Sequence, residues 1–364
     1  MLARHAEDMF WAGRYLERAE DTARMVRATL LSTVANTPTH AVERMEHLIG
    51  TLRLEMPTSV STVQSMAQSI AQAPPTLHSQ AGLGIDVQAA ATALVASPTL
   101  AGSVVFCIDR ARENFRSLRD QVPSELWEQI NQLHLRLRQS DFTATMEQDP
   151  FQTLDFIRVS CQSLTGVIST SMAQGEGYRF LVLGTTLERA LMTCRLISVR
   201  YPELDGSSYD EMALTLRSVS ALEAYQKASR SSPLAADVAR FLLLNDSFPR
   251  SVLYCLRDCE QHLSALAPEG KAPPLRHLGQ LRSELEYGDL HTLLAGLPAL
   301  LTKIEAGVRG VADDLSHYFF RNAETLDLHS QAICPGVSAE TNIPAAPSKK
   351  TKNTDNPTTQ HPQP

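Results

Sequence analysis

This sequence has no apolar stretch long enough to suggest a membrane span, although 43% of its 364 residues are hydrophobic. A spanning helix needs about 20 consecutive apolar residues, and polar residues interrupt every run well before that length. The N-terminus also differs from a signal peptide, because His5, Glu7 and Asp8 stand where its apolar core would begin. We therefore expect a cytoplasmic protein that does not associate with a membrane.

The sequence also lacks an excess of positive charge and a cysteine framework. Its formal net charge is −7, which gives no general attraction to nucleic acid or to anionic membranes. No nucleic-acid partner is therefore expected. The six cysteines include no Cys-x-x-Cys pair, and their spacing suits neither a disulfide framework nor a zinc site. We expect reduced thiols, most of them in helix cores.

Motifs for common cofactors and metals are missing as well. The chain has no Gly-x4-Gly-Lys-Ser/Thr phosphate loop, and no Gly-x-Ser-x-Gly elbow supports a Ser-His-Asp triad. A ferritin-like di-iron site needs Glu-x-x-His pairs, and the chain contains none. We therefore expect no metal and no cofactor.

Helical spacing dominates what is present. Apolar residues recur at steps of three and four along residues 2–33, which predicts one long amphipathic helix that ends before Pro38. Pro and Gly fall mainly between such runs, and the whole pattern predicts an all-α fold. Further helices are expected at about 40–54, 61–72, 85–96, 99–120, 124–139, 150–173, 177–200, 208–230, 234–245, 249–266, 274–286 and 289–322.

Two segments repeat in the same order along the chain. Residues 13–24 (GRYLERAEDTAR) match residues 184–195 (GTTLERALMTCR) at seven of twelve positions. Further along each half, Ser103–Ile108 matches Ser251–Leu256. Because both matches keep their order, they indicate an internal duplication.

The duplication predicts a multi-helix bundle of two related halves. The N-terminal half, with the first Glu-Arg motif, is expected at 1–140, and the C-terminal half, with the second motif, at 150–325. Beyond them Pro, Thr, Asn and Lys replace apolar residues. Residues 331–364 therefore cannot offset the entropy of ordering and are predicted to form a disordered tail.

Each motif helix combines an apolar seam with a stripe of charge. On the first helix Ala12, Leu16 and Ala19 begin the seam, and Glu17 and Arg24 lie about 100° around the helix axis. The second motif repeats this arrangement. If the halves pack with pseudo-twofold symmetry, the two stripes face one central groove. Two interpretations stay open: ion pairs that fix helix packing, or a groove that binds or transforms a ligand.

Several segments together resemble a known family. The first helix, Phe10–Arg24, resembles the opening of the alpha-E family, bacterial helical proteins named for a Glu-Arg motif. Later segments are similar to further motifs of that family, over about residues 1–325 in total: Ala111–Asp120 with Ser124–Glu128, Gly175–Ala190 and Asn245–Val252.

The resemblance implies partners rather than a known reaction. Alpha-E proteins are typically encoded beside, or fused to, circularly permuted ATP-grasp proteins, often with transglutaminase-like and Ntn-hydrolase-like proteins. The resemblance therefore implies an accessory protein of an ATP-grasp amide-ligase system that modifies peptides or metabolites. The expected partners are the ATP-grasp protein, a transglutaminase-like protein, and a peptide or small carboxylate ligand.

Our first hypothesis for the site is an Arg/Glu-lined groove. Arginine forks bind carboxylates through paired charge-assisted hydrogen bonds, so such a groove would hold a carboxylate-bearing substrate or partner. Thr185 and Met192 stand where the first motif has Arg14 and Asp21, which favours the N-terminal copy as the working one. The candidate binding residues are Arg14, Arg18, Asp21, Arg24, Arg112, Asn114, Arg189 and Arg195.

Two alternatives remain. In the first, the chain is an enzyme that uses Glu17 or Glu188 as a general base, and that glutamate should then lie in a cleft with a raised pKa. In the second, the chain is a purely structural helical scaffold. A Glu17–arginine ion pair sealed in a dry core would favour this scaffold.

Overall fold

The computed structural model describes residues 1–33, 38–53, 86–204, 209–229, 234–267 and 272–320. These ranges contain helices and no strand, which confirms the predicted all-α fold. The helix expected at 61–72 and the tail at 331–364 lie outside them. Within the same ranges, no helix has the length and apolar character that crossing a membrane requires.

The order of helices in the first half recurs in the second. The first half contains α1 (Ala3–Thr33), α2 (Pro38–Leu52), α5 (Val87–Ala96), α6 (Val104–Ser117), α7 (Ser124–Leu137), α8 (Phe142–Gln148) and α9 (Pro150–Ser171). The second half contains α10 (Glu176–Leu204), α11 (Tyr209–Ser218), α12 (Leu222–Ala228), α13 (Ala235–Leu244), α14 (Val252–Leu266), α15 (Pro273–Tyr287), α16 (Leu290–Ala295), α17 (Leu297–Leu315) and the π-helical turn η1 (Ser316–Phe320).

Equal spacing shows how far this repeat extends. The helices α5 and α13 have equal length and begin 148 residues apart, at 87 and 235. Ser103 and Ser251 cap α6 and α14 in the same way, because each hydroxyl accepts a hydrogen bond from the backbone N–H three residues later. Each hydroxyl also donates to a carbonyl oxygen six residues earlier in the chain. The sequence repeat therefore corresponds to a repeat of local structure.

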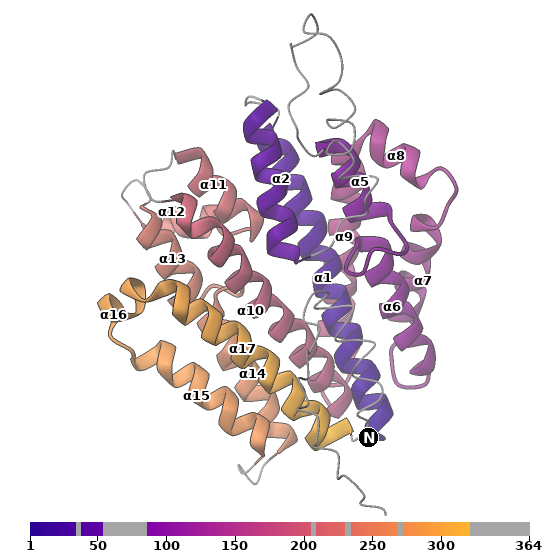
Figure 1. The fold of residues 1–364 in the computed structure, drawn as a ribbon. Helices are drawn as coiled ribbons and strands as arrows, with labels where there is room; N and C mark the ends of the chain where they lie inside the picture. The colour runs from indigo at the N-terminus through magenta and orange to yellow at the C-terminus, as the bar shows by residue number, and fades with distance from the viewer. Residues whose placement is uncertain (34–37, 54–85, 205–208, 230–233, 268–271, 321–364) are drawn as a thin grey trace, which may run out of the picture.

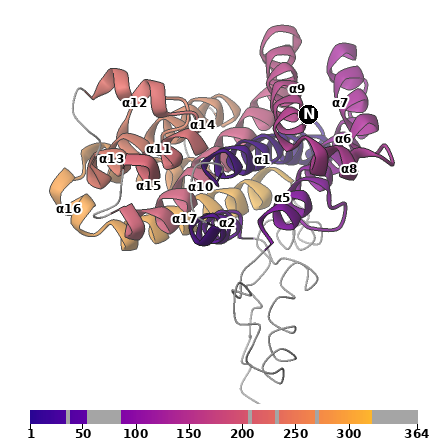
Figure 2. The ribbon, with the colours of Figure 1, turned by 90° about the horizontal axis from the view of Figure 1, so that it is seen from above.

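The two motif helices form the centre of the molecule, as Figures 1 and 2 show. α1 packs against α10, and each central helix is covered by the same elements of its own half: α6 and α9 pack on α1, while α14 and α17 pack on α10. The second helix of each half reaches across, so that α2 also packs on α10 and α11 on α1. The packing thus has pseudo-twofold symmetry about the α1/α10 crossing.

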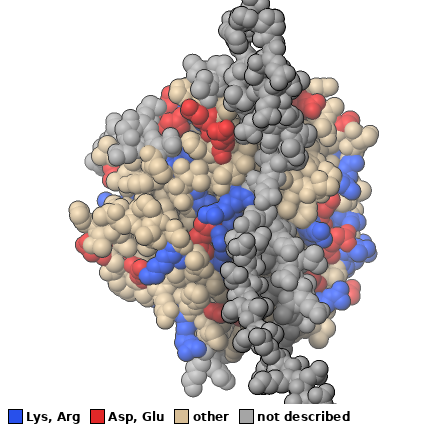
Figure 3. Space-filling model, in the orientation of Figure 1, with Lys and Arg blue, Asp and Glu red and all other residues tan. Residues whose placement is uncertain are grey.

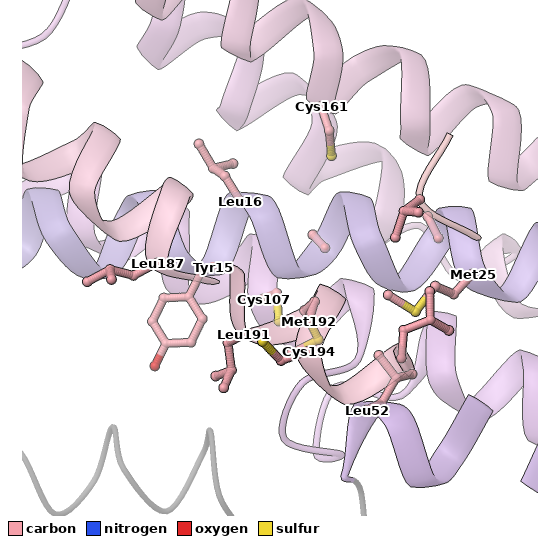
Figure 4. Close-up of a cluster of buried hydrophobic side chains, with 14 of the residues drawn as sticks. Tyr15, Leu16, Met25, Leu52, Cys107, Cys161, Leu187, Leu191, Met192 and Cys194 are labelled. Carbon is pink, nitrogen blue, oxygen red and sulfur yellow. The ribbon is translucent and has the colours of Figure 1, made fainter. Parts of the chain in front are cut away.

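The apolar core surrounds this crossing. In Figure 4, Tyr15, Leu16 and Met25 of α1 lie in one cluster with Leu187 and other side chains of α10. Five cysteines lie in the described ranges, and all five are buried and free. Burial raises the pKa of the Cys107 thiol to about 12. These five are therefore the reduced core thiols that the sequence predicted.

Three predicted helix boundaries were wrong. The helix expected at 208–230 is two helices, because Ser220 adopts a left-handed φ of 53° between α11 and α12. The helix expected at 289–322 is interrupted at Gly296, after which α17 begins at Leu297 with Pro298 in its first turn. A short helix, α8, occupies the expected gap between residues 139 and 150.

The division into 1–140 and 150–325 stays a prediction. The structure packs α9 against α1 and α7 of the first half. Buried residues Leu154, Ile157 and Cys161 of α9 recur in α17 at a constant spacing of 147, as Leu301, Ile304 and Val308. This correspondence favours a first repeat that includes α9.

Candidate functional site

Two glycines set the distance between the motif helices. Gly13 of α1 lies directly against the backbone of Leu181, and Gly184 of α10 lies against the backbone of Phe10. These contacts are equivalent under the repeat, since residue 181 follows residue 10 by the same 171 positions that separate 184 from 13. Any larger residue at either position would push a side chain into the facing backbone. The small residues recognised in the sequence therefore permit a close helix crossing.

Reciprocal ion pairs flank the crossing. Arg189 donates from Nε and Nη2 to the two carboxylate oxygens of Glu17, each at 2.8 Å. Its counterpart Arg18 donates from Nε to Glu188 at 2.6 Å. Glu17 and Glu188 are only 3% and 0% exposed. The predicted stripes do face each other, and they pair with each other in a buried interface, so the glutamates do not line an open groove.

The symmetry breaks where the second motif lacks charge. Arg14 donates to Glu188 at 2.9 Å, whereas its counterpart Thr185 donates to the Leu181 carbonyl oxygen. The second arginine partner of Glu17 is Arg250, which lies just before the start of α14. Its Nη1 donates to the Glu17 carboxylate at 2.7 Å. Each glutamate therefore has two arginine partners, although only one glutamate takes both from the facing motif helix.

Carboxylates further along α1 extend the network. Arg24 pairs with Glu20 and Asp21 on its own helix, and Arg250 also lies 2.7 Å from Asp21. In the second motif Leu191 and Met192 replace these carboxylates. Arg195, the counterpart of Arg24, instead pairs with Glu305 of α17 at 3.1 Å.

The charges of this network control its pKa values. Burial alone would raise the pKa of Glu17, but Arg189 and Arg250 outweigh it and hold the pKa below its ordinary value. The same balance, with Arg18 and Arg14 as partners, lowers the pKa of Glu188. Asp21 has the opposite shift: burial and the neighbouring Glu17 outweigh Arg250 and raise its pKa to about 6.

Asp21 should therefore make stability depend on pH in a recognisable direction. The pKa of Asp21 is about 6 in the folded chain and ordinarily 3.8. Its contribution to the free energy of unfolding is therefore complete below pH 3.8 and is lost as the pH rises through 6. We expect the wild type to lose about 2–3 kcal/mol of unfolding free energy relative to Asp21→Asn across this window. Urea unfolding of both proteins at pH 4, 5, 6 and 7 measures the difference.

The glutamates provide an internal control for this measurement. Glu17 and Glu188 have lowered pKa values, so their contribution is complete above pH 4.5 and is lost at lower pH. The contribution of Glu188, which pairs with Arg14 and Arg18 and shares no partner with Asp21, is common to the wild type and Asp21→Asn and cancels in the comparison. Parallel stability curves for the two proteins between pH 4 and 6 would contradict the raised pKa of Asp21.

Two predicted binding residues lie apart from the network. Arg112 of α6 donates to Asn131 at 2.8 Å and stacks over the Trp127 ring. Asn114 lies two residues along the same helix and is half-buried. Glu113 between them pairs with Arg112 and Arg116. On the face seen in Figure 3, basic and acidic side chains are mixed along this side of the molecule. Neither residue contributes to the Glu-Arg arrangement.

The remaining predicted residues all belong to the network, in a form that favours the packing interpretation. Arg14, Arg18, Arg24 and Arg195 are buried and paired with carboxylates of the chain itself, and only Arg189 keeps an exposed fraction of 17%. Sequence reasoning missed Arg250 and Glu305. Arg250 lies in the quoted Asn245–Val252 motif, which was a usable signal, whereas Glu305 had none.

The carboxylates of the network lie close together on one helix. Among the described residues, no group of three or more His, Cys, Asp or Glu side chains is arranged to hold a metal ion. Three carboxylates of α1, those of Glu17, Glu20 and Asp21, pair instead with Arg24, Arg189 and Arg250.

Comparisons with known proteins agree with this helical architecture. A family model named Alpha-E, described as a predicted alpha-helical domain with a conserved ER motif, matches residues 1–320. Similar proteins include uncharacterized proteins of Mycobacterium bovis and Mycobacterium tuberculosis, 26% identical over 341 residues, which is 85% of this chain and 36% of each relative. The chain therefore spans about a third of the length of these relatives. No solved structure gives a significant match.

Proposed function

Because the chain belongs to the Alpha-E family, we propose that it is a structural partner of an ATP-grasp amide-ligase system that modifies peptides or small metabolites. In this role the α1/α10 crossing is the rigid centre of the body. Contacts with the ligase are made on the outer surface, and the Glu-Arg motif is not an active site.

The observation that carries the proposal is the pair of reciprocal, buried ion pairs. A general base must accept a proton near neutral pH, whereas arginine partners hold the pKa values of Glu17 and Glu188 below their ordinary value. A substrate carboxylate at Arg14 and Arg18 would have to displace Glu188 from a buried interface. Both considerations favour a packing role for the motif over catalysis or binding.

The length of the relatives supports a partner role. In each of them the region similar to this chain is 36% of the whole, so the helical body is accompanied by further polypeptide. We propose that the helical body acts together with the ATP-grasp protein implied by the family resemblance.

The test uses the ATP-grasp protein that the family resemblance implies, with the implied transglutaminase-like protein as a second candidate. We expect the purified ATP-grasp protein to bind the full chain in calorimetry, and its ATP turnover to rise when the chain is added. Glu17→Gln keeps the size of the side chain and two hydrogen-bonding atoms, one oxygen and one nitrogen. The amide cannot act as a base. If the motif only packs helices, this variant should change ATP turnover less than about threefold wherever its melting curve shows a folded protein.

Two results would overturn the proposal. A loss of turnover of 100-fold or more in folded, ligase-binding Glu17→Gln would restore the general-base hypothesis, because removal of a catalytic base typically costs 10²–10⁴-fold. Absence of any binding by the wild-type chain would remove the partner role itself.

A further inference from the structure

A groove runs between α7 and α9 on the outside of the first half, where Figure 2 shows the two helices side by side. Its volume is about 840 Å³. Side chains of both helices line it, and most of them are amides, hydroxyls or apolar groups. The lining includes Gln129, Leu133 and Arg136 of α7, and Asp155, Phe156, Val159, Ser160 and Ser163 of α9.

In the second half the equivalent helices, α15 and α17, pack closely against each other. There Gly307 of α17 lies against Leu281, and Gly310 lies against His277, both of α15. The repeat places Ser160 and Ser163 at the positions of these glycines, with a spacing of 147 residues. Without side chains at 307 and 310, α17 approaches α15 closely.

The first half has side chains at these positions, and the groove is open. Ser163 reaches across and donates to Gln129 at 3.0 Å, which is the contact equivalent to Gly310 on His277. Ser160 lines the groove opposite Leu133, the counterpart of Leu281. Serine side chains at 160 and 163 therefore distinguish this helix pair from its counterpart, in which glycines lie directly against the facing helix.

Apolar side chains are exposed at the edge of this groove. Phe156 is 43% exposed and Val159 is 55% exposed. Their counterparts in the second half are Lys303 and Ala306, both on the exposed side of α17. Because the second copy folds with Lys and Ala there, the packing of the bundle does not require apolar residues at these positions. Phe156 and Val159 are neighbours on one face of α9, and apolar side chains that are exposed together in this way are typical of an interaction surface.

The rim of the groove carries a positive charge excess. Arg27 and Arg158 share the single carboxylate of Asp155. Arg136 donates to Gln139, and within the described ranges it forms no ion pair with a carboxylate. Arg27 and Arg158 thus pair with the groove residue Asp155, and Arg136 lines the same groove. The excess of positive charge beside an apolar surface complements an acidic and apolar partner.

We propose that the groove between α7 and α9 binds an amphipathic helix of the ligase partner, with apolar side chains at three- and four-residue spacing and flanking Asp or Glu. This inference rests on the proposed function. The apolar stripe of the incoming helix would cover Phe156 and Val159, and its carboxylates would pair with Arg136 and Arg158. Such helix-in-groove binding uses a few anchoring side chains on one helix face.

The internal repeat supplies the variant that tests this. Phe156→Lys with Val159→Ala introduces the residues that the second copy already tolerates, so the fold should be unaffected. Leu135→Lys is the matched control, because Leu135 is an equally exposed apolar residue of α7, at 57%, that does not line the groove. In calorimetry with the purified ATP-grasp partner, we expect the double variant to bind about 30-fold more weakly or worse, and the control to bind as the wild type does.

A second variant tests the charge of the rim. Arg136→Glu leaves the apolar residues in place and should weaken binding about tenfold at low salt, with a smaller effect at 0.5 M salt. A melting temperature within 2 °C of the wild type, measured for each variant, shows that the effect is on binding.

The outcomes separate the two proposals. If the partner binds the wild type and the double variant equally, the groove proposal is overturned while the proposed function stands. If the partner does not bind the wild type, both fail. If the wild type dimerises in sedimentation experiments and the double variant is monomeric, a second copy of this chain fills the groove, and the proposed ligase helix is overturned.

Discussion

Replacing Gly184 by alanine is expected to lower the unfolding free energy by at least about 3 kcal/mol, the upper end of the usual cost of an overpacked interior. The added Cβ would overlap the carbonyl oxygen of Phe10 and approach the backbone nitrogen of Arg14. Both are main-chain atoms of α1, which cannot rotate away as a side chain can. Relief therefore requires α1 and α10 to separate, and separation would lengthen the ion pairs beside the crossing. Urea unfolding followed by circular dichroism measures the loss.

The matched control is Gly166→Ala in the middle of α9. A Cβ at this position meets no other atom within 4 Å, and alanine is a better helix former than glycine by about 0.5–1 kcal/mol. The control should therefore stabilise the protein, so the same substitution has opposite signs at the two sites. Equal, small effects at both positions would contradict the close helix crossing.

Replacing Glu188 by glutamine is expected to cost about 3–5 kcal/mol. The variant keeps the size of the side chain but leaves the buried guanidinium groups of Arg14 and Arg18 beside a neutral amide. Removing one partner of a buried pair exposes the full cost of burying the other charge. Chemical unfolding at pH 7 checks the value, and a variant that fails to fold would agree with it.

Glu113→Gln is the matched control for Glu188→Gln. Glu113 also pairs with two arginines, but its side chain is 45% exposed, so its loss should cost less than about 1 kcal/mol. A triple variant, Glu188→Leu with Arg14→Met and Arg18→Met, should regain most of the lost stability, because well-packed apolar residues often replace buried ion pairs without cost. If that variant folds but no longer binds the ATP-grasp partner, the motif does more than pack helices.

Much of the fold could be predicted from residue spacing. The helix over 2–33 and the all-α class follow from apolar periodicity, and Asp149 with Pro150 marks the start of α9 as expected. The breaks at Ser220 and Gly296 were missed, because apolar residues continue on both sides of each break. Local propensity is a weak guide where tertiary packing decides how a chain turns.

The site could be predicted only in part. The shared spacing of Gly13 and Glu17 with Gly184 and Glu188 suggested that two charged stripes face each other, and they do. The sequence could not show whether water or protein fills the space between them. That depends on elements far along the chain, such as the loop that carries Arg250 and the helix that carries Glu305.

The reciprocal ion pairs also set the order in which a growing chain can finish folding. Glu17 is synthesised early, but its partner Arg189 follows 172 residues later, roughly 10–30 s at ordinary rates of translation. Until then the carboxylate of Glu17 on α1 has no guanidinium partner from the second half. The α1/α10 crossing can therefore form only after α10 has emerged from the ribosome, so the first half cannot complete its core during its own synthesis.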